Sequence, residues 1–162
     1  MSRHSWPPSP TATPRTTPSN VRRMQHELVH LDVDGGIARI TLDSPHNRNA
    51  LSRQLITELH ASLDEIDRAD LGEIRAVVLG HSGPVFCSGA DLNERSSPGA
   101  SGVDEHPGTS MSIVIIRLID MPRPTIAAVR GPVRAGGIWL MATCDLILVD
   151  RSVDFALTEL RI

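Results

Sequence analysis

The first apolar stretches of the chain alternate with polar residues at the spacing of β-strands. Residues 27–33 and 37–42 show this pattern, and the turn Asp34-Gly35-Gly36 separates them. Glycine accepts the backbone angles that a tight connection between antiparallel strands requires. The pattern therefore predicts a β-hairpin at the start of the folded part of the chain.

From residue 52 the apolar spacing lengthens to three and four residues. Ser52 is a suitable N-cap, because its hydroxyl can accept a hydrogen bond from an amide of the first helical turn. The apolar residues at helical spacing are Leu55, Ile56, Leu59, Leu63 and Ile66. We expect a helix to about residue 69, with Asp64 and Arg68 forming an i,i+4 ion pair on its outer side.

Strands and helices alternate through the rest of the chain. The predicted strands span residues 74–79, 125–129, 146–149 and 153–156, and the predicted helices span residues 110–120 and 135–143. Pro122 ends the first of these helices, because the residue before a proline disfavours helical backbone angles. The alternation predicts an α/β fold with right-handed crossovers. Repeated units of two strands and a helix fit better than a Rossmann sheet, since no GxGxxG or Walker sequence occurs.

The composition changes at about residue 25. Residues 1–24 are rich in proline, serine and threonine and contain no acidic residue, so they cannot bury enough apolar area to become ordered. An arginine-rich, acid-free start is also typical of a mitochondrial transit peptide, but the prolines oppose the amphipathic helix of such a peptide. We expect a disordered tail over residues 1–24, one folded domain over residues 25–162, and a mobile loop at about residues 96–109.

Length and charge exclude several classes of function. The 162 residues suit one domain with its own core. A net charge of −3 argues against nucleic acid as a partner. All 16 basic residues are arginine, so no lysine is present to form a Schiff base. No apolar run is long enough to span a bilayer, so a membrane is not an expected partner.

The two cysteines, Cys87 and Cys144, lie far apart in apolar segments. We interpret both as small buried hydrophobic residues in a reducing compartment, which favours a cytoplasmic location. The histidines form no HExxH sequence and no cluster with cysteine, so no metal site is predicted.

Two glycine-bearing turns, each between a predicted strand and a predicted helix, are the strongest functional signal. They span residues 86–92 and 130–137. The start of a helix leaves backbone N–H groups without intrahelical partners. Two such turns facing one point would form an oxyanion hole, which holds a carbonyl oxygen as it becomes negative. Taken singly, each turn is better explained as ordinary helix-start chemistry, but the ordered pair favours binding.

With these turns the chain resembles the crotonase superfamily of enoyl-CoA hydratases and isomerases. Four segments match the motifs of that family in order, over roughly residues 27–162. They are Pro45-His46-Asn47-Arg48-Asn49-Ala50-Leu51, Phe86-Cys87-Ser88-Gly89-Ala90-Asp91-Leu92, residues 131–145 with their final Cys144-Asp145, and Phe155-Ala156-Leu157-Thr158-Glu159. The second and third segments are specific, and their joint order and spacing are hard to obtain by chance.

The resemblance implies an α/β fold of repeated β-β-α turns wound into a superhelix, incomplete at its C-terminal end. It also implies assembly as a homotrimer or homohexamer if the C-terminal part of the family fold is present. It implies an acyl-CoA thioester as ligand, with coenzyme A carried as part of the substrate and no separate cofactor. By position it places the oxyanion-hole amides on Ala90 and Gly136. It places contacts to coenzyme A and the acyl group on Asn49, Ala50, Leu51, Ala90, Asp91, Leu92, Asn93, Gly136 and Trp139.

The chain departs from the family pattern at its acids. In family hydratases two glutamates hold the added water; the resemblance assigns one to Glu159, while Trp139 stands in the place of the other. Indole has only an N–H donor and cannot act as a general acid or base. Hydration should therefore be impaired, whereas double-bond isomerisation needs only one proton-transferring group. Trp139 either lines the acyl pocket or packs in the core. Without the resemblance, Glu159 would be interpreted as an ordinary solvated carboxylate.

Other residues in these segments have simpler readings. Asp91 can cap the following helix instead of touching a ligand. Arg48 and Arg95 can meet the phosphates of coenzyme A, although exposed arginines usually meet water. The chain ends at Ile162, where family members continue, so we expect an apolar face without cover.

Three hypotheses follow from these features. The first is an enoyl-CoA hydratase/isomerase-type enzyme of fatty-acyl-CoA metabolism, in which Glu159 transfers the proton. The second is a non-catalytic acyl-CoA-binding protein, and the third is an inactive truncated remnant.

Overall fold

The computed structural model describes residues 27–95 and 110–157. The predicted tail over residues 1–24, the predicted loop over residues 96–109 and Glu159 lie outside these ranges.

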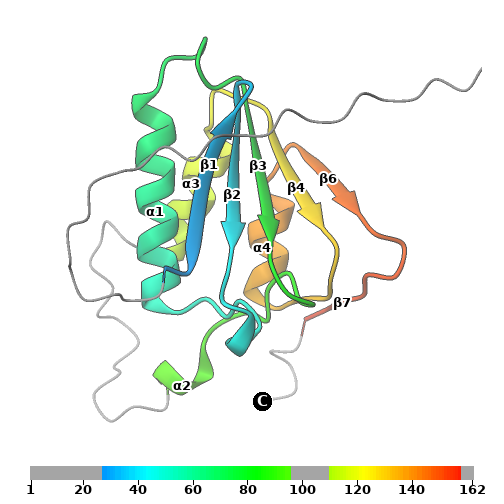
Figure 1. Ribbon diagram of the computed structural model, residues 1–162. Coiled ribbons are helices and arrows are strands. Elements are labelled where there is room, and N and C mark those ends of the chain that lie inside the picture. The colour runs from blue at the N-terminus through cyan, green and yellow to red at the C-terminus, as the bar shows by residue number, and fades with distance from the viewer. Residues whose placement is uncertain (1–26, 96–109, 158–162) are drawn as a thin grey trace, which may run out of the picture.

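Five strands form the main sheet, in the spatial order β1-β2-β3-β4-β6 (Figure 1). Their bounds are β1 Val29–Asp34, β2 Ile37–Leu42, β3 Ala76–His81, β4 Thr125–Val129 and β6 Leu146–Val149. β1 and β2 form the predicted hairpin and run antiparallel, with Val29 opposite Leu42. All other neighbouring strands are parallel, because each connection between them returns through a helix.

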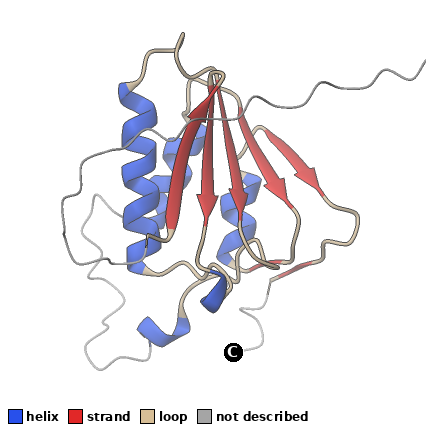
Figure 2. Cartoon of the chain, in the orientation of Figure 1, coloured by secondary structure: helices blue, strands red, loops and turns tan. Residues whose placement is uncertain are grey.

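The helices are α1 Arg53–Arg68, α2 Leu92–Arg95, α3 Met111–Ile119 and α4 Gly136–Ala142, with a 3-10 turn η1 over Pro45–Asn47. Helices α1, α3 and α4 lie along this sheet, whereas the short turns η1 and α2 lie beyond the ends of the strands (Figure 2). Ser52 caps α1 as predicted, accepting a hydrogen bond from the Leu55 amide at 3.2 Å, and Ser110 caps α3 in the same way. The single turns η1 and α2 are too short to produce a periodic pattern, and the sequence did not indicate them.

One face of the main sheet carries the core. The buried strand residues on this face stand opposite one another, with Ala38 beside Val77 and Ile40 beside Leu79. Helix α1 covers them with the predicted apolar stripe, in which Leu55, Leu59, Leu63 and Ile66 are fully buried. Because paired residues in a sheet point to the same side, this register keeps the apolar set on the helix side.

The outer side of α1 differs in one contact from the prediction. Asp64 does lie 4.0 Å from Arg68. Its closer partner is Arg117 of α3, at 2.8 Å, and Arg117 also reaches Asp67 at 2.6 Å. The shorter ion pair of Asp64 therefore joins α1 to α3. The residue spacing within α1 could not predict a partner on another helix.

A second, smaller sheet lies at the carboxyl ends of the parallel strands. It pairs β5 Val133–Arg134 with β7 Phe155–Ala156, in parallel. Isolated bridges extend it, joining Cys87 to Val133 and Leu51 to Ala90. β5 was not predicted, because its two residues lie inside what the sequence presents as a glycine turn. Each repeat thus gives a long strand to the main sheet and a short one to this layer, which confirms the predicted β-β-α superhelix.

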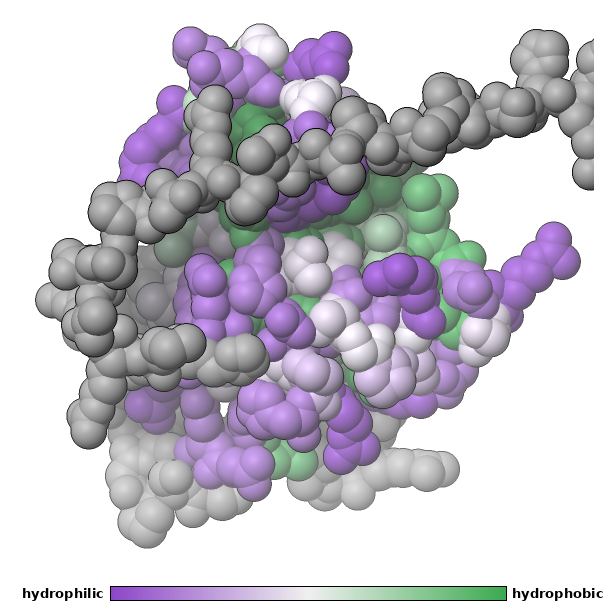
Figure 3. All heavy atoms as spheres, viewed as in Figure 1, coloured by the Kyte–Doolittle hydropathy of each residue, from purple (hydrophilic) through white to green (hydrophobic). Residues whose placement is uncertain are grey.

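The last long strand lacks the cover that parallel strands normally have. All four residues of β6 are exposed, from 40% for Ile147 to 65% for Leu148. Strands of a parallel sheet are usually buried on both faces, and the four β6 side chains differ from that pattern in the described part of the chain. Figure 3 shows hydrophobic side chains gathered on the side of the molecule where β6 lies. Among the described residues, no helix is long and apolar enough to cross a membrane.

Candidate active site

The two glycine turns singled out in the sequence touch each other in the fold. A Cβ placed on Gly89 would lie 2.6 Å from the Ala135 Cβ and 3.4 Å from the Gly136 nitrogen. Gly89 also has a φ of +89°, a conformation that L-residues rarely adopt. Glycine is thus required twice at position 89, by its backbone angle and by the close approach of the second turn.

Backbone pairing holds the two turns in this position. The Phe86 amide donates to the Pro132 carbonyl at 3.1 Å, and the Arg134 amide donates to the Cys87 carbonyl at 2.9 Å. On the far side, the Ala135 amide donates to the Ala156 carbonyl at 3.0 Å. The second turn is therefore clamped between the first turn and β7.

The Ala90 amide does not take part in the hydrogen bonds of the parallel bridge between Leu51 and Ala90. The Leu51 amide donates to the Gly89 carbonyl at 2.8 Å, and the Asp91 amide donates to the Leu51 carbonyl at 3.4 Å. In a parallel bridge of this kind the central residue turns its own N–H away from the partner strand. Among the described residues, no acceptor is hydrogen-bonded to the Ala90 amide.

The amide of Gly136 is free for a different reason. Gly136 is the first residue of α4, and the first amides of a helix have no carbonyl one turn earlier to receive them. Ala135 precedes it with φ 49° and ψ −123°, a strained conformation for a residue with a side chain. This kink turns the chain into α4 and sets the direction of the Gly136 amide, for which the described part of the chain supplies no acceptor.

Leu51 joins the two amide positions. It forms the bridge to Ala90, and its Cδ1 lies 2.9 Å from where a Cβ on Gly136 would stand. Ala50 and Leu51 are 6% and 8% exposed. The structure thus brings Leu51, Ala90 and Gly136 together.

Asn49, the other residue of that loop, is enclosed and fully engaged. Its side chain accepts from the Ser44 amide at 2.7 Å and donates to the carbonyls of Ser82 and Val85 at 3.1 and 2.8 Å. Its exposure is 0%, so its side chain offers nothing to a ligand. We therefore interpret Asn49 as the residue that fixes the loop, and its expected contact with coenzyme A does not involve its side chain.

Asp91 acts as a cap. One carboxylate oxygen accepts from the Asn93 amide at 3.0 Å, and the other accepts from the Asn47 side chain at 3.3 Å. Leu92 is 54% exposed. Asp91 therefore caps the short helix α2, as the alternative interpretation of this residue proposed. Because Ala90 precedes Asp91 directly, this cap also helps to hold the Ala90 amide in place.

Cys87 lies beneath the two turns and is not a nucleophile. Its Sγ accepts from the Gly89 amide at 3.4 Å, and its side chain packs against Gly137. Burial raises the pKa of the Cys87 thiol to about 11, so the thiol stays protonated at neutral pH. Cys144 is also buried and free.

Trp139 lies on α4, three residues after Gly136. Its side chain is 59% exposed, so the alternative that it packs in the core is wrong. Residues three apart on a helix share a face, which leaves the indole on the side of α4 where the Gly136 amide begins the helix.

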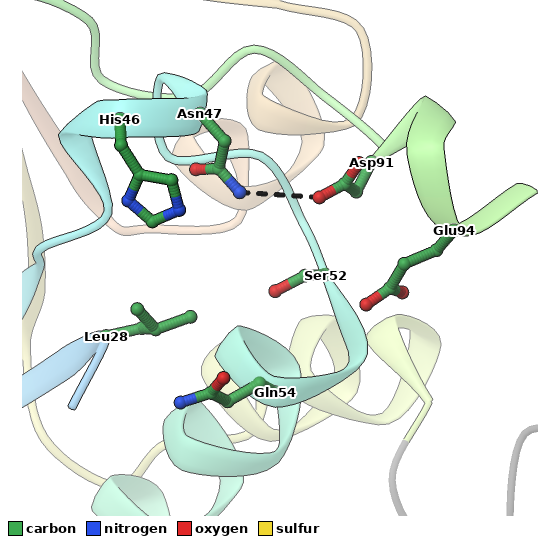
Figure 4. A pocket seen from close by; sticks show the side chains of 7 residues that line it. All are labelled: Leu28, His46, Asn47, Ser52, Gln54, Asp91 and Glu94. Carbon is green, nitrogen blue, oxygen red and sulfur yellow. Dashed lines mark hydrogen bonds between the residues drawn. The ribbon is translucent and has the colours of Figure 1, made fainter. Parts of the chain in front are cut away.

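A cavity of about 350 Å³ opens beside the turns (Figure 4). It is lined by Leu28, His46, Asn47, Ser52, Gln54, Asp91 and Glu94. These residues flank the two segments that the resemblance assigned to coenzyme A. The side chains seen in Figure 4 bring two carboxylates, of Asp91 and Glu94, to one wall and leave the Leu28 side chain on the opposite wall.

Sequence reasoning missed Asn47 and Glu94 as members of this site. Glu94 accepts from the Arg53 amide at 3.0 Å and so caps α1 from another segment. Asn47 accepts from the Ser44 hydroxyl at 2.7 Å while donating to Asp91. Both act on residues distant in the chain, so no local spacing signals them. In the described ranges no group of three or more metal-ligating side chains is present.

The geometry agrees with the crotonase resemblance: two turns of a β-β-α superhelix touch, and the amides of Ala90 and Gly136 have no acceptor among the described residues. The comparisons agree: the family model for enoyl-CoA hydratase/isomerase matches residues 32–162. The chain belongs to the enoyl-CoA hydratase/isomerase family.

Individual relatives give the same result. The chain is 38% identical over 129 residues to the mitochondrial enoyl-CoA hydratase domain-containing protein 3 of Danio rerio, covering 80% of this chain and 44% of that protein. It is 32% identical over 138 residues to an enoyl-CoA isomerase/hydratase of Mycosarcoma maydis, covering 78% and 50%. A crystal structure of an enoyl-CoA hydratase from Mycobacterium smegmatis superposes with a TM-score of 0.75 at 32% identity, covering 83% of this chain and 52% of that one.

The chain spans about half the length of the curated relatives it matches. The activity and substrates of those proteins are therefore taken to this chain only as a proposal.

Proposed function

We propose that this chain binds an acyl-CoA thioester and polarises its carbonyl between the amides of Ala90 and Gly136, as an enoyl-CoA hydratase/isomerase-type protein. The observation that carries the proposal is the contact between two turns whose amides have no acceptor in the described part of the chain. Backbone donors held in this way need no reorganisation when negative charge develops on the oxygen, and one such donor contributes roughly 100- to 1,000-fold in rate.

The reaction best suited to one acid is double-bond isomerisation. In a 3-enoyl thioester, a carboxylate removes a proton from carbon 2, and the electron pair moves onto the thioester oxygen as a dienolate. The two amides stabilise that oxygen, and the same carboxylic acid returns the proton to carbon 4. We assign this role to Glu159, by its place in the matched segment. No separate cofactor is required, because coenzyme A is part of the substrate.

Trp139 distinguishes this reaction from hydration. Adding water needs one group to position the water and another to move its proton, and the indole can do neither as a base. We propose that Trp139 forms a wall of the acyl site instead. Its large exposed ring offers apolar area to an acyl chain.

The charges of the cavity limit which part of coenzyme A it can hold. Asp91 and Glu94 present two carboxylates there, and Glu94 is partly offset by Arg53, whose Nε lies 3.9 Å away. Phosphate groups would be repelled by the remaining negative charge. We therefore propose that the uncharged pantetheine arm lies along this cavity and that the phosphates extend beyond it into solvent.

A pair of variants at one position tests the amide directly. Gly136→Pro removes the N–H at the first helical position, where proline is otherwise favoured. Gly136→Ala keeps the N–H and introduces the same Cβ contact with Leu51. With a 3-enoyl-CoA substrate, we expect kcat for the proline variant to fall roughly 100-fold below that of the alanine variant. Equal rates for the two would refute the role of the Gly136 amide.

The acid is tested by Glu159→Gln with crotonyl-CoA and a 3-enoyl-CoA as substrates. Loss of isomerisation with retained binding of acyl-CoA would support the proposal. Undiminished turnover would refute it. The second candidate, a non-catalytic acyl-CoA-binding protein, is favoured by Trp139 alone, and calorimetric binding of acyl-CoA by folded chain without any turnover would select it.

A further inference from the structure

His81 is buried at the point where the chain leaves the main sheet toward the first glycine turn. It is the last residue of β3 and is only 3% exposed. Arg130 occupies the corresponding place after β4, at the start of the second turn. Because β3 and β4 run parallel, both turns leave the sheet at the same edge. The His81 side chain therefore lies where the two segments that carry Ala90 and Gly136 begin.

The imidazole of His81 contacts the first residue of each turn. On one side it packs against the ring of Phe86, edge to face, with the ring centroids 5.5 Å apart and an interplanar angle of 78°. On the other side, the Arg130 amide donates to His81 Nε2 at 3.1 Å. The Arg130 guanidinium also donates to the His81 carbonyl at 3.1 Å. One side chain thus joins the two turns at their starting points.

The partners of the ring assign its protonation state. A backbone amide only donates, so the Nε2 atom that faces Arg130 is unprotonated and accepts. A carbonyl only accepts, so Nδ1, which lies 3.2 Å from the Ser82 carbonyl oxygen, carries the proton. The hydrogen-bond network therefore assigns a neutral imidazole with its proton on Nδ1.

A second proton on the ring would break this connection. The imidazolium has a donor at each nitrogen, so an N–H on Nε2 would point at the N–H of Arg130. Burial lowers the pKa of His81, and the charge of Arg130 adds to this effect, against the opposing effect of the Ser82 carbonyl. Beyond Ser82, the carboxylate of Asp43 binds the Ser82 hydroxyl and the His30 ring. The charged groups around His81 are thus Arg130 and, one residue further away, Asp43.

The two segments are tightly packed next to the connection. A Cβ on Gly131 would lie 2.2 Å from the Pro84 carbonyl oxygen, and the Phe86 amide donates to the Pro132 carbonyl at 3.1 Å. Any displacement of Arg130 is therefore passed on to the turn that follows it. A misplacement of about 1 Å in a group that acts on the transition state costs about 100-fold in rate.

We propose that His81 is a positioning residue for the oxyanion hole: as a neutral imidazole it connects the starts of the two glycine turns and sets how the amides of Ala90 and Gly136 converge. The proposal rests on the proposed function of those two amides. His81 itself touches neither amide nor substrate in this role. It acts through Phe86 and Arg130.

NMR spectroscopy tests the connection without any substrate. A long-range proton–nitrogen correlation spectrum of the imidazole should show the His81 proton on Nδ1. As the pH is lowered below about 6.5, we expect the amide signals of Arg130, Ala90 and Gly136 to shift with the same midpoint as the His81 ring. A proton on Nε2, or amide signals that do not follow the titration of His81, would overturn the proposal.

Two variants separate the contact with Arg130 from the rest of the side chain. In His81→Gln the carboxamide oxygen takes the place of Nε2 and accepts from the Arg130 amide, but it does not titrate. In His81→Asn the shorter side chain reaches only the position of Nδ1, so the Arg130 amide loses its acceptor. With a 3-enoyl-CoA at about pH 8, we expect kcat for His81→Asn to be about tenfold or more below that for His81→Gln, with KM values within about twofold, because the amides act on the transition state. Equal kcat values for the two folded variants would contradict the proposal.

The pH profile of kcat supplies a matched control. Between about pH 7 and about pH 5, the ratio of kcat for the unchanged chain to that for His81→Gln should fall about threefold or more. His60→Gln is the control, because His60 is 6% exposed and its ring binds the Ser110 carbonyl and the Arg117 side chain at α3, not the turns. The corresponding ratio for His60→Gln should stay constant.

A constant ratio for His81→Gln, over the pH range in which circular dichroism shows folded chain, would also overturn the proposal. Absence of turnover in every chain would instead refute the proposed function. The NMR titration then still decides whether His81 sets the positions of the Ala90 and Gly136 amides.

Discussion

The strongest prediction for stability concerns Asn49, which fixes the loop that carries Leu51 to the site. In Asn49→Ala the Ser44 amide and the Val85 carbonyl lose the partners that the side chain supplied at 2.7 and 2.8 Å. The Ser82 carbonyl keeps a second contact, from the His81 ring at 3.2 Å. The change therefore removes the partner of one buried backbone group, the Ser44 amide, and of one partly buried group, the Val85 carbonyl.

The expected cost follows from these contacts. Each buried polar group left without a partner costs about 1–3 kcal/mol. Asn49 also has a φ of +52°, a left-handed conformation that asparagine tolerates better than alanine, by about 1 kcal/mol. Together we expect Asn49→Ala to lower the free energy of unfolding by about 4 kcal/mol, a large part of the stability of a domain this size.

Urea unfolding followed by circular dichroism measures this cost, with Asn47→Ala as the matched control. Asn47 also makes three side-chain hydrogen bonds in the same loop, but it is only half-buried, so water can replace them. We expect a loss of about 1 kcal/mol for the control. A loss for Asn49→Ala below about 1.5 kcal/mol, or one equal to that of Asn47→Ala, would refute the reasoning.

Three further predictions follow from the described contacts. Gly89→Ala should lower the free energy of unfolding by about 2 kcal/mol and weaken acyl-CoA binding in calorimetry, because the added Cβ would clash with Ala135. The control Gly72→Ala should change neither quantity, because a Cβ at Gly72 meets nothing within 4 Å. Cys87 should resist a thiol reagent at pH 8 until urea unfolds the chain, because burial raises its pKa to about 11; reaction of native chain would contradict this. Burial lowers the pKa of His81, so the unfolded chain binds a proton at His81 more readily than the folded chain does. The free energy of unfolding should therefore be highest above about pH 6.5 and fall as the pH drops below that value. His81→Gln should flatten that decline in urea midpoint, and an unchanged slope would rule His81 out.

Local patterns were sufficient for the long elements. Ser52 and the apolar residues after it gave α1, because capping and helical spacing act within a few residues of each other. The strand over residues 125–129 was found with its observed bounds. β5, η1 and α2 were missed because two to four residues carry no period. The backbone of β5 also pairs with segments far away in the chain, namely β7 and Cys87.

The candidate site divides in the same way. Gly89 and Gly136 were visible as turn and helix-start residues, and the resemblance gave their order. Three features of the site depend on segments more than 30 residues apart. They are the contact between the two glycine turns, the hydrogen bonds that enclose the Asn49 side chain, and the capping of α1 by Glu94. Trp139 illustrates the limit, because its residue type is compatible with core or surface and only the packing shows it 59% exposed.

By itself, then, the sequence determined the order of strands and helices, the positions of the glycine turns and the family to which they belong, because these follow from chemistry between near neighbours. The tertiary structure decided which amides have no acceptor among the described residues and which polar side chains hold the loops in place. Those properties depend on what lies opposite each group, and a neighbour across space is set by the whole fold.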